Sequence, residues 1–453
     1  MIVMKFGGTS VGVPEHFAVA QRLVVERRVS DPVVVVSALA GVTNLLVDFC
    51  REPVERRLRA ERLERRHTEF AAAVGVDAGA LVPLLEEWRE AASVHARSSR
   101  SLQGEARDAV LAFGERLSSA IFAAGLTARG VPARAIDAGD AGLVTDDRFG
   151  AAHPLPAATA RLREGLSRRP PLPVVTGFLG RTDDGRVTTL GRGGSDYSAA
   201  LIGAALGADE IQIWTDTSGM LSADPRIVPE ARPVPRLSFA EASELAYFGA
   251  RVLHPKTLLP AMERGIPVRV LNTTRPDDPG SLIAAASDEP GPAPGWRVKS
   301  IASKQAITAV TIASTRMLLA HGFLARVFEV FGRHHVVVDL VTTSEVSISV
   351  TVDDATRLEE AIAELEGIGR VEVRQGLAVV AVVGEGAPTR IGLAGHVFTL
   401  LGGVGIGVEM ISQGASRVNL SFVVREEDAA RAVRLLHRGL GLDVEVGAHT
   451  AHA

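Results

Sequence analysis

The stretch LGRGGSDYSAA, residues 190–200, holds three glycines, one arginine and one aspartate where a core strand or helix would carry apolar side chains. Glycine lets the backbone come close to a bound molecule. The guanidinium of Arg192 can grip a carboxylate or phosphate through two parallel bonds, and Asp196 can hold a magnesium ion or orient a basic side chain. A purely structural turn rarely needs both charges, so the pattern predicts a ligand site.

A second pattern opens the chain, where the predicted strand IVMKF runs into Gly7-Gly8-Thr9-Ser10. Free amides on a glycine turn, the N-terminus of a following helix and the charge of Lys5 are all suited to phosphate. Glycine turns between a strand and a helix are also common as structural features. This one matches neither the P-loop signature nor a full dinucleotide fingerprint. The phosphate interpretation therefore depends on the residues at 190–200.

Two further segments belong to the same predicted site. IWTDTSGMLSADPR puts Thr215 and Asp216 at the end of a strand, where open α/β sheets place their ligand contacts. Just before residue 190, the segment VVTGFLGRTDDGRVTTL predicts a strand followed by a polar hairpin that contains several glycines. Such a hairpin is suited to covering a site.

Short Val- and Ile-rich runs must position these residues, and they alternate with longer Ala-, Leu- and Arg-rich stretches of helical character. The runs are VVVV at 33–36, PVV at 173–175, IQIW at 211–214 and PVRVLN at 267–272. The alternation predicts an α/β fold with a mostly parallel sheet sandwiched by helices. The charges of the segment 51–124 fit the solvated faces of helices and receive no function.

The segment SDEPGPAPG, residues 287–295, contains three prolines and two glycines and predicts a domain boundary. Beyond it RVFEVFGRHHVVVDL (326–340) and HVFTLLGGVGIGVEM (396–410) repeat, each followed by a strand and a helix. The repeat predicts two small ferredoxin-like modules. The expected division is a catalytic domain at 1–286, a linker at 287–299 and a tandem regulatory region at 300–453, with units near 312–383 and 384–453 that are free to exchange strands.

Composition narrows the class of protein. Hydrophobic residues make up 46% and charged residues 23% of the 453 residues, with a net charge of −4, so nucleic acid is a poor candidate partner. The single cysteine, Cys50, cannot form an intrachain disulfide and fits a small buried residue. The start of the chain lacks a signal-peptide pattern, and no uninterrupted apolar run has the length of a membrane helix. We expect a cytoplasmic protein without membrane contact.

Taken together, KFGGTSV, GERLS, TGFLGR, GRVTTLGRGGSDYSAA, WTDTSGMLSADPR and FGARVLHPKTL resemble the aspartate kinases, a family within the amino-acid kinase superfamily. GFLARVFEVFGRHHVVVDLVTTSEVSISV resembles the paired ACT regulatory domains of the lysine-sensitive, monofunctional type. The resemblance implies ATP-dependent phosphorylation of the L-aspartate side chain to 4-phospho-L-aspartate, the first step of lysine, threonine and methionine biosynthesis. It also implies Mg²⁺ bound with ATP, feedback inhibition by L-lysine, and a homodimer or higher oligomer formed through the ACT domains.

The same resemblance assigns roles to particular residues. Catalysis would fall to Lys5, Arg192 and Asp196, and no metal site made by the protein alone is implied. The implied aspartate contacts are Thr43, Glu115, Arg192 and Ser195. The implied nucleotide contacts are Lys5, Gly7, Gly8, Ser10, Thr215, Asp216, Asp224, Arg226 and Arg251. The implied effector contacts are Met317, Phe323, Leu324, Val338, Asp339 and Ser344.

The chain departs from the family pattern at three positions. Leu221 stands where lysine-sensitive relatives carry a tyrosine near the nucleotide, and Arg251 replaces the lysine of FGAKVLHP. Ala320 stands where these relatives carry a serine, which removes one polar contact with the effector.

Two other functions remain open at this level. One is an amino-acid kinase acting on glutamate or acetylglutamate, against which the set of Thr43, Glu115 and Arg192 argues. The other is a catalytically weak amino-acid sensor that keeps the fold.

Three further patterns favour ordinary structural roles. His254 fits a packed or capping residue, because phosphoryl transfer to a carboxylate needs no base at neutral pH. His334-His335 fits a helix end, and GGVGIG at 402–407 fits a tight turn that leads into a strand.

Overall fold

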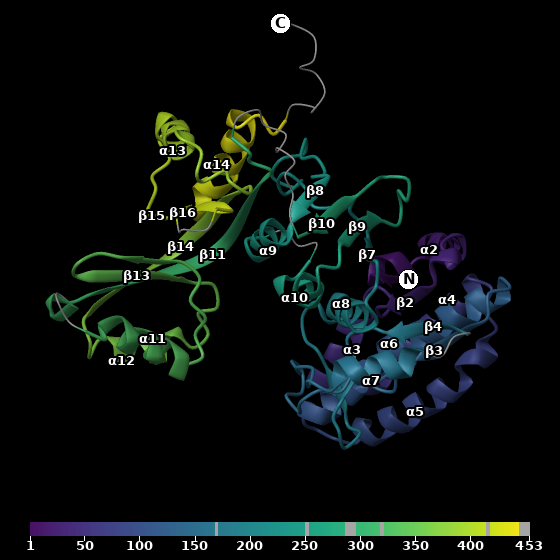
Figure 1. The fold of residues 1–453 in the computed structure, drawn as a ribbon. Coiled ribbons are helices and arrows are strands. Elements are labelled where there is room, and N and C mark those ends of the chain that lie inside the picture. Colours follow the sequence, from purple (N-terminus) through teal and green to yellow (C-terminus); the bar gives the residue numbers. More distant parts are fainter. Residues whose placement is uncertain (168–170, 250–252, 286–295, 318–320, 414–416, 444–453) are drawn as a thin grey trace, which may run out of the picture. The chain divides into compact units, whose positions relative to one another are not determined.

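The protein is described by a computed structural model that covers residues 1–167, 171–249, 253–285, 296–317, 321–413 and 417–443. The chain forms two compact units (Figure 1). Unit 1 comprises Met1–Met220, Pro235–Phe239 and Arg251–Ser287, and unit 2 comprises Leu221–Val234, Ala240–Ala250 and Asp288–Ala453.

Unit 1 is built on an eight-stranded sheet of order β3-β4-β2-β1-β7-β9-β10-β8. Its strands are β1 Ile2–Phe6, β2 Pro32–Val36, β3 Ala133–Ile136, β4 Leu172–Thr176, β7 Glu210–Thr215, β8 Arg236–Ser238, β9 Val268–Asn272 and β10 Ser281–Ala284. Neighbouring strands pair in parallel except β9 with β10, which are antiparallel. The predicted mostly parallel α/β fold is confirmed, and all four predicted strand runs are strands.

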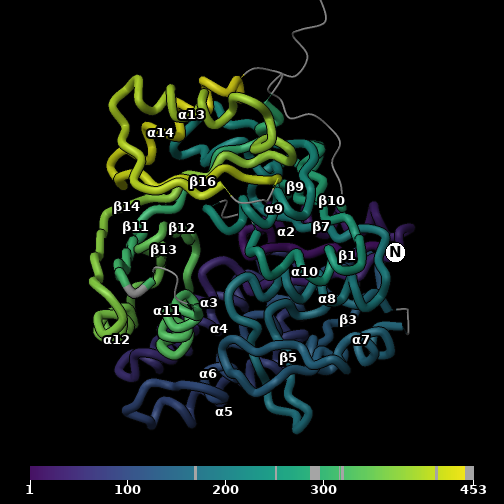
Figure 2. The backbone as a smooth tube through the Cα atoms, turned by 60° about the vertical axis from the view of Figure 1, so that its left-hand side comes forward, coloured from purple at the N-terminus to yellow at the C-terminus, as the bar shows by residue number. Residues whose placement is uncertain are grey.

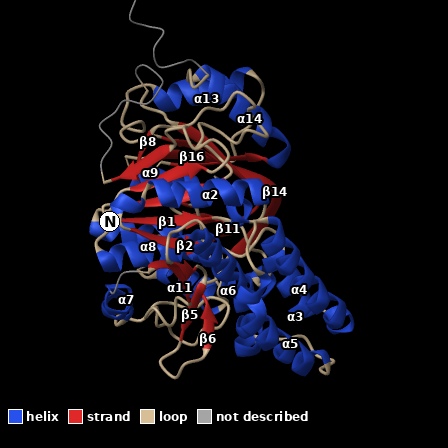
Figure 3. Cartoon of the chain, turned by 90° about the vertical axis from the view of Figure 1, so that its right-hand side faces the viewer, coloured by secondary structure: helices blue, strands red, loops and turns tan. Residues whose placement is uncertain are grey.

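Helices cover both faces of this sheet, as the buried side chains of its central strands require (Figure 3). The α-helices of unit 1 are α1 Gly8–Val11, α2 Pro14–Glu26, α3 Val42–Arg51, α4 Arg56–Ala73, α5 Val82–Ala96, α6 Gly104–Ala128, α7 Ala158–Ser167, α8 Gly194–Leu206 and α10 Pro255–Arg264. A two-stranded hairpin, β5 Leu179–Arg181 and β6 Val187–Thr189, pairs apart from the sheet.

Side chains of β1 alternate between the two faces of the sheet, because successive residues of a strand point to opposite sides. Met4 and Phe6 join the hydrophobic core that contains residues of α2, α3 and α6. Val3 lies near α8, and Lys5 reaches a side chain of the same helix. This alternation directs the lysine of the first motif to the face that carries residues 190–200.

Helix α6 is long and apolar enough to pass a length-and-composition test for a membrane span, the one such helix among the described residues. It is 78% buried within the structure over the window that passes. Its apolar side chains instead form part of the core of unit 1.

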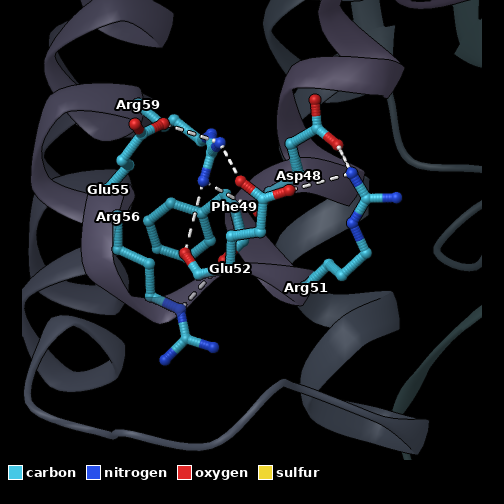
Figure 4. Close-up of polar contacts among 7 residues, drawn as sticks. All are labelled: Asp48, Phe49, Arg51, Glu52, Glu55, Arg56 and Arg59. Carbon is cyan, nitrogen blue, oxygen red and sulfur yellow. Dashed lines mark hydrogen bonds and ion pairs between the residues drawn. The ribbon is translucent and has the colours of Figure 1, made fainter.

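The junction between α3 and α4 carries a network of charged side chains (Figure 4). Arg51 pairs with Asp48 at 3.0 Å and with Glu52 at 2.9 Å. Arg59 pairs with Glu52 at 2.5 Å and with Glu55 at 2.8 Å. Several of these groups are exposed, so each pair contributes little by itself, but together they tie the C-terminal end of α3 to α4.

Arg56 is buried next to this network, and among the described residues its guanidinium donates hydrogen bonds to backbone carbonyls. Its guanidinium donates to the carbonyl oxygens of Phe49, Cys50, His95, Ser98 and Arg100 at 2.6–3.0 Å. A buried guanidinium needs such acceptors, because leaving its N–H groups unpaired would be costly. Arg56 thereby fixes the end of the helix whose first turn carries Thr43.

Unit 2 contains a six-stranded antiparallel sheet of order β12-β13-β11-β14-β16-β15. Its strands are β11 Ser300–Ala313, β12 Val341–Thr343, β13 Ser347–Val352, β14 Arg370–Val383, β15 Met410–Ser412 and β16 Asn419–Arg425. Its helices are α9 Phe239–Tyr247, which begins in unit 1, α11 Phe323–Arg333, α12 Leu358–Leu365, α13 Leu393–Gly403 and α14 Glu426–Gly439. Each predicted repeat therefore folds as helix, strand, strand and helix.

The two repeats share one sheet because β11 and β14 are long enough to serve both (Figures 1 and 2). The first half of β11 pairs with the second half of β14, and the second half of β11 with the first half of β14. The register shifts near Lys304–Ile307, where Ala306 has a φ of 58°. Gly376 on β14 has a φ of 69°. The tetrads Lys304-Gln305-Ala306-Ile307 and Arg374-Gln375-Gly376-Leu377 thus hold matching positions in the two repeats.

Unit 2 also takes in 221–234 and most of α9, segments that the sequence placed within the catalytic domain. Lys299 pairs with Glu241 of α9 at 2.9 Å, and both side chains are buried. Ser222 Oγ lies 2.9 Å from His437 Nε2 on α14. These buried polar contacts hold the earlier segments to the sheet of unit 2.

Candidate active site and effector region

The predicted substrate residues line one cleft of about 700 Å³ in unit 1. Its walls come from the end of β1, the start of α3, the middle of α6 and the turn that begins α8. Of the predicted residues, Lys5, Gly8, Thr43, Glu115, Arg192, Ser195 and Asp196 line it. The fold therefore brings together residues from four distant parts of the sequence.

Lys5 and Asp196, which both line this cleft, form an ion pair. Lys5 Nζ lies 2.5 Å from Asp196 Oδ1, and both side chains are largely buried. A buried lysine needs such a partner to stay charged. Asp196 thus holds the ammonium of Lys5 in place, which is one of the two roles that the sequence left open for this aspartate.

Glu115 is the second buried charge-bearing group of the cleft, with 3% of its surface exposed. Its Oε1 accepts a hydrogen bond from the backbone N–H of Ala38 at 3.2 Å. Its Oε2 is buried and accepts no hydrogen bond from any residue that the structure describes. Burial raises the pKa of Glu115 to about 8, although the Ala38 N–H and the charge of Lys5 lower it. An oxygen of this kind is a ready partner for a ligand's ammonium group.

Arg192 lies exposed on the turn before α8, between Gly191 and Gly193. Both glycines have positive φ, 76° and 69°, which favours glycine. A side chain at Gly193 would also meet His254 Cβ at 2.8 Å. Among the residues described, Arg192 forms no ion pair, so its guanidinium is available to an anionic ligand.

The lining of the cleft includes a strained residue that the sequence did not single out. Phe178 lines the cleft with a φ of 66°, an uncommon conformation for a bulky residue. A Cβ at the preceding Gly177 would lie 2.6 Å from Ser195 Cβ. Backbone strain of this kind concentrates at functional sites. In the sequence, the glycine directly before this aromatic residue was the signal that could have pointed to Phe178.

The predicted phosphate residues divide into two groups. Gly8 lines the cleft, whereas Gly7 and Ser10 do not. The buried Ser10 hydroxyl donates to the Trp214 carbonyl at 3.1 Å and lies 2.7 Å from Thr273 Oγ1. Its side chain therefore ties α1 to the sheet.

Thr215 and Asp216 lie at the C-terminal end of β7, as predicted. Thr215 Oγ1 donates to Asp216 Oδ1 at 3.1 Å. The Gly7 N–H donates to the carbonyl of Trp214, the preceding residue of β7, at 3.0 Å. The glycine turn and the two polar residues therefore share one edge of the sheet, where nucleotides commonly bind in such folds.

The other predicted nucleotide residues do not belong to unit 1 or are not described. Asp224 accepts from the Arg226 backbone N–H at 2.9 Å and from its Nε at 3.0 Å, and both lie in unit 2. Leu221 also belongs to unit 2. Arg251 and Ala320 lie outside the described residues. The nucleotide roles of Asp224, Arg226 and Arg251 stay predictions.

Across the described ranges, no three His, Cys, Asp or Glu side chains are grouped so that they could hold a metal ion. Magnesium needs several oxygen ligands and commonly takes them from phosphates and water in nucleotide sites. This donor set fits an ion that arrives with the nucleotide and finds Asp196 as a nearby carboxylate.

Asp339 is the predicted effector residue with the most unusual environment. Its side chain is 1% exposed, and neither carboxylate oxygen accepts a hydrogen bond within the described part of the chain. Lys304 Nζ lies 3.7 Å from it and 2.6 Å from Asp353. Burial, and then the charge of Asp353, raise the pKa of Asp339 to about 7. The same lysine lies over the Tyr247 ring at 4.4 Å.

The other predicted effector residues differ in exposure. Phe323 is buried in the core of the first repeat, and Met317 and Val338 pack against that core. Leu324 is 40% exposed, and Ser344 is exposed with its hydroxyl 2.7 Å from that of Ser347. Phe323 therefore has a packing role, and Asp339 is the one charged group of the set.

The structural roles predicted for Cys50 and two of the histidine positions are confirmed. His254 precedes α10 and accepts from the Lys256 N–H at 3.3 Å. His334 follows α11 and lies 2.9 Å from Glu364 of α12, a side-chain contact in addition to the helix end. Cys50 is buried, and burial raises its pKa to about 11.

Asp108, Arg107 and Thr189 were also missed by the sequence reasoning. Arg107 and Thr189 line the cleft. Asp108 is fully buried on α6, the helix that carries Glu115. An acidic residue within a long apolar helix was a signal that could have drawn attention to it.

Comparisons with known proteins agree with this geometry. The amino acid kinase family model matches residues 1–272, and an ACT domain model matches 310–367 and 380–440. The chain therefore belongs to the amino acid kinase family, in the group that carries C-terminal ACT domains.

Its relatives narrow the family further. The chain is 40% identical to the chloroplastic aspartokinase 1 of Arabidopsis thaliana, over 96% of this chain and 79% of that protein. It is 38% identical to the lysine-sensitive aspartokinase 3 of Escherichia coli, over 97% and 99%. The crystal structure of E. coli aspartokinase III with aspartate and ADP matches with a TM-score of 0.84 and 36% identity, over 97% and 99%. The chain is a member of the aspartokinases.

Proposed function

We propose that the protein transfers the γ-phosphoryl group of ATP to the side-chain carboxylate of L-aspartate, forming 4-phospho-L-aspartate. The observation that carries this is the buried Glu115, whose Oε2 accepts no hydrogen bond from the described residues, in a cleft with the exposed Arg192. These two groups match the ammonium and the α-carboxylate of an amino acid. A relative of known structure binds aspartate and ADP, which supports the proposal.

The residues of the cleft would act by positioning and charge. Lys5, held by Asp196, would neutralise charge on the transferring phosphoryl group. The bond from an aspartate carboxylate oxygen to phosphorus forms as the bond from phosphorus to the ADP oxygen breaks, so no covalent enzyme intermediate is needed. Mg²⁺ bound with ATP would shield the phosphate charges. Thr43 and Ser195 would orient aspartate, and Gly7, Gly8, Thr215 and Asp216 would lie toward the nucleotide.

We propose further that residues 1–286 carry catalysis and 300–453 regulation by L-lysine. Asp339 would receive the lysine ammonium, supported by its burial and by the fact that neither carboxylate oxygen accepts a hydrogen bond from the described residues. Lysine sensitivity is part of the name of the E. coli relative. The protein would act in the cytoplasm as a homodimer or larger oligomer, which size-exclusion chromatography with light scattering measures.

An ADP-release assay with Mg-ATP tests the function across aspartate, glutamate and N-acetylglutamate. Aspartate should give the highest kcat/KM by far. A preference for either other acid would overturn the substrate, and ADP release with none of the three would leave the sensor alternative. Titration of lysine, threonine and methionine against the aspartate reaction tests the regulation separately.

A further inference from the structure

Asp108 is a fully buried acid whose carboxylate joins three segments of unit 1. It lies on α6, and its Oδ2 accepts the backbone N–H of Gly150 at 2.8 Å and of Thr189 at 2.7 Å. Gly150 belongs to the loop before α7, and Thr189 ends β6. Both amide-bearing residues line the substrate cleft, whereas Asp108 lies behind them.

The position of Asp108 on α6 relates it directly to Glu115. The two acids are about two helical turns apart, roughly 10 Å along the axis, and therefore share one face of the helix. Glu115 lines the cleft from this side of α6. Two turns earlier, Asp108 binds the backbone N–H groups of Gly150 and Thr189 across from the helix. Helix α6 thus carries both a proposed ligand contact and an anchor for the wall.

The wall that Asp108 anchors is the one that carries Arg192. Thr189 is followed by Leu190, whose N–H donates to the Phe178 carbonyl at 2.9 Å, and then by the glycine turn with Arg192. The Thr189 carbonyl accepts from Ala152 N–H at 2.9 Å, which binds the Gly150 loop to the same strand. Gly191 lies close to the Gly150 carbonyl, 3.1 Å from where a Cβ would stand. Arg192 itself has glycines on both sides, so its place depends on these anchors.

Burying the carboxylate of Asp108 costs free energy, and a role in anchoring the wall that carries Arg192 would justify this cost. Burial raises its pKa above the ordinary value, and the two amides lower it. Its Oδ1 is buried and accepts no hydrogen bond from the residues described here. Two amides on one carboxylate oxygen form strong, directional bonds in a dry setting, and these set a distance between helix and strand.

We infer that Asp108 is a positioning residue that sets the spacing between Glu115 and Arg192, and so the fit of the cleft to the two charged ends of an amino-acid substrate. The inference rests on the proposed function for the identity of that substrate. Asp108 does not touch the substrate; it acts through the backbone of Gly150 and Thr189.

Kinetics of the full-length protein with aspartate and ATP varied separately test this role. Asp108→Ala should raise the aspartate KM about tenfold or more and leave the ATP KM within about twofold, because misplaced positioning groups weaken use of the ligand that they hold. Asp108→Glu keeps the charge but lengthens the side chain, so it should also raise the aspartate KM. Asp108→Asn keeps an acceptor at the same length and should restore the KM to within about threefold of wild type.

His67→Ala is the matched control, because His67 is also fully buried in unit 1, on α4, and among the described residues it hydrogen-bonds to the Leu63 carbonyl of its own helix. It should lower the melting temperature and leave the aspartate KM unchanged. An unchanged aspartate KM in Asp108→Ala or Asp108→Glu would overturn the inference, as would an equal rise in both KM values. If Asp108→Ala does not fold, Asp108→Glu decides. Wild-type protein without aspartate-dependent ADP release would instead refute the proposed function.

Discussion

Glu115 in unit 1 and Asp339 in unit 2 are two buried acids in the same electrostatic situation. Each has a carboxylate oxygen that accepts no hydrogen bond from the described residues, and burial raises the pKa to about 8 and about 7. Each has a lysine nearby that is paired more closely with another aspartate: Lys5 with Asp196 and Lys304 with Asp353. Both acids are suited to receive a cation from outside.

The surroundings of the two acids differ in what else they offer. The cleft around Glu115 also presents Arg192, which forms no ion pair with the described residues, and so matches both ends of a zwitterion. The predicted effector set around Asp339 carries no second charge. The cleft of unit 1 therefore offers complementary charges to both ends of an amino acid, whereas the predicted effector set in unit 2 offers a charge to an ammonium group alone.

The second repeat carries an acid at the matching position, but in a different environment. Glu409 is the next-to-last residue of 396–410, as Asp339 is of 326–340. Glu409 is 30% exposed and pairs at 2.7 Å with Arg374, which matches Lys304 in the repeat. An exposed, satisfied acid offers a ligand little, so the two repeats share a fold but not a receptive site.

Lys5→Ala should have the largest effect, because it removes the cation of the cleft. We expect kcat to fall by about two orders of magnitude or more, as for other preorganised charges at a transferring group. Steady-state ADP release measures it, and thermal unfolding checks the fold. Near-normal turnover in a folded variant would remove Lys5 from the mechanism.

Glu115→Gln should raise the aspartate KM by about 10- to 100-fold, the loss expected for one charge-assisted bond. The ATP KM should change little. In wild type, the protonated carboxyl cannot pair with an ammonium, so kcat/KM for aspartate should rise with pH up to about 8, the pKa of Glu115. The variant should lose this rise. A pH profile that is the same in both proteins would contradict the role of Glu115.

Asp339→Asn should raise the lysine concentration needed for half inhibition by about tenfold or more, with uninhibited activity unchanged. It should also stabilise the protein at pH 8. A raised pKa means that the folded state holds this proton more tightly, so wild-type stability falls as pH rises from about 4 to about 7. Inhibition assays and melting temperatures at pH 5 and pH 8 check both effects. Unchanged inhibition in the variant would place the effector elsewhere.

Lys304→Gln should lower the lysine concentration for half inhibition by about two- to fivefold. Lys304 lies 3.7 Å from Asp339, so it competes with an incoming ammonium for the same carboxylate. The same inhibition titration measures the change, with high salt reducing it. Weaker inhibition would mean that Lys304 supports the effector instead of competing with it.

Glu409→Gln should have the smallest effect: inhibition and activity within about twofold of wild type. Its partner Arg374 is exposed and regains water when the pair is lost. A loss of lysine inhibition as large as that of Asp339→Asn would erase the proposed difference between the repeats.

Much of the architecture could be predicted from local sequence. Apolar runs such as VVVV at 33–36 identify buried parallel strands because both faces of the sheet are covered. The repeat at 326–340 and 396–410 predicted the elements of unit 2. The sequence left the two repeats free to exchange strands, but it did not identify β11 and β14 as the strands that serve both, because strand pairing depends on register between distant segments.

The sequence by itself determined the parallel sheet, the repeats and the chemical types of the site, since hydrophobic period and residue chemistry are local properties. Only the tertiary structure decided that Lys5 pairs with Asp196 and that the buried Ser10 hydroxyl contacts Thr273. The same is true of the hydrogen bonds from the backbone N–H groups of Gly150 and Thr189 to Asp108. Each of these contacts joins segments far apart in the chain. The packing of helices on the sheet sets which groups meet and which, like Glu115 Oε2, are buried with no hydrogen-bond partner among the described residues.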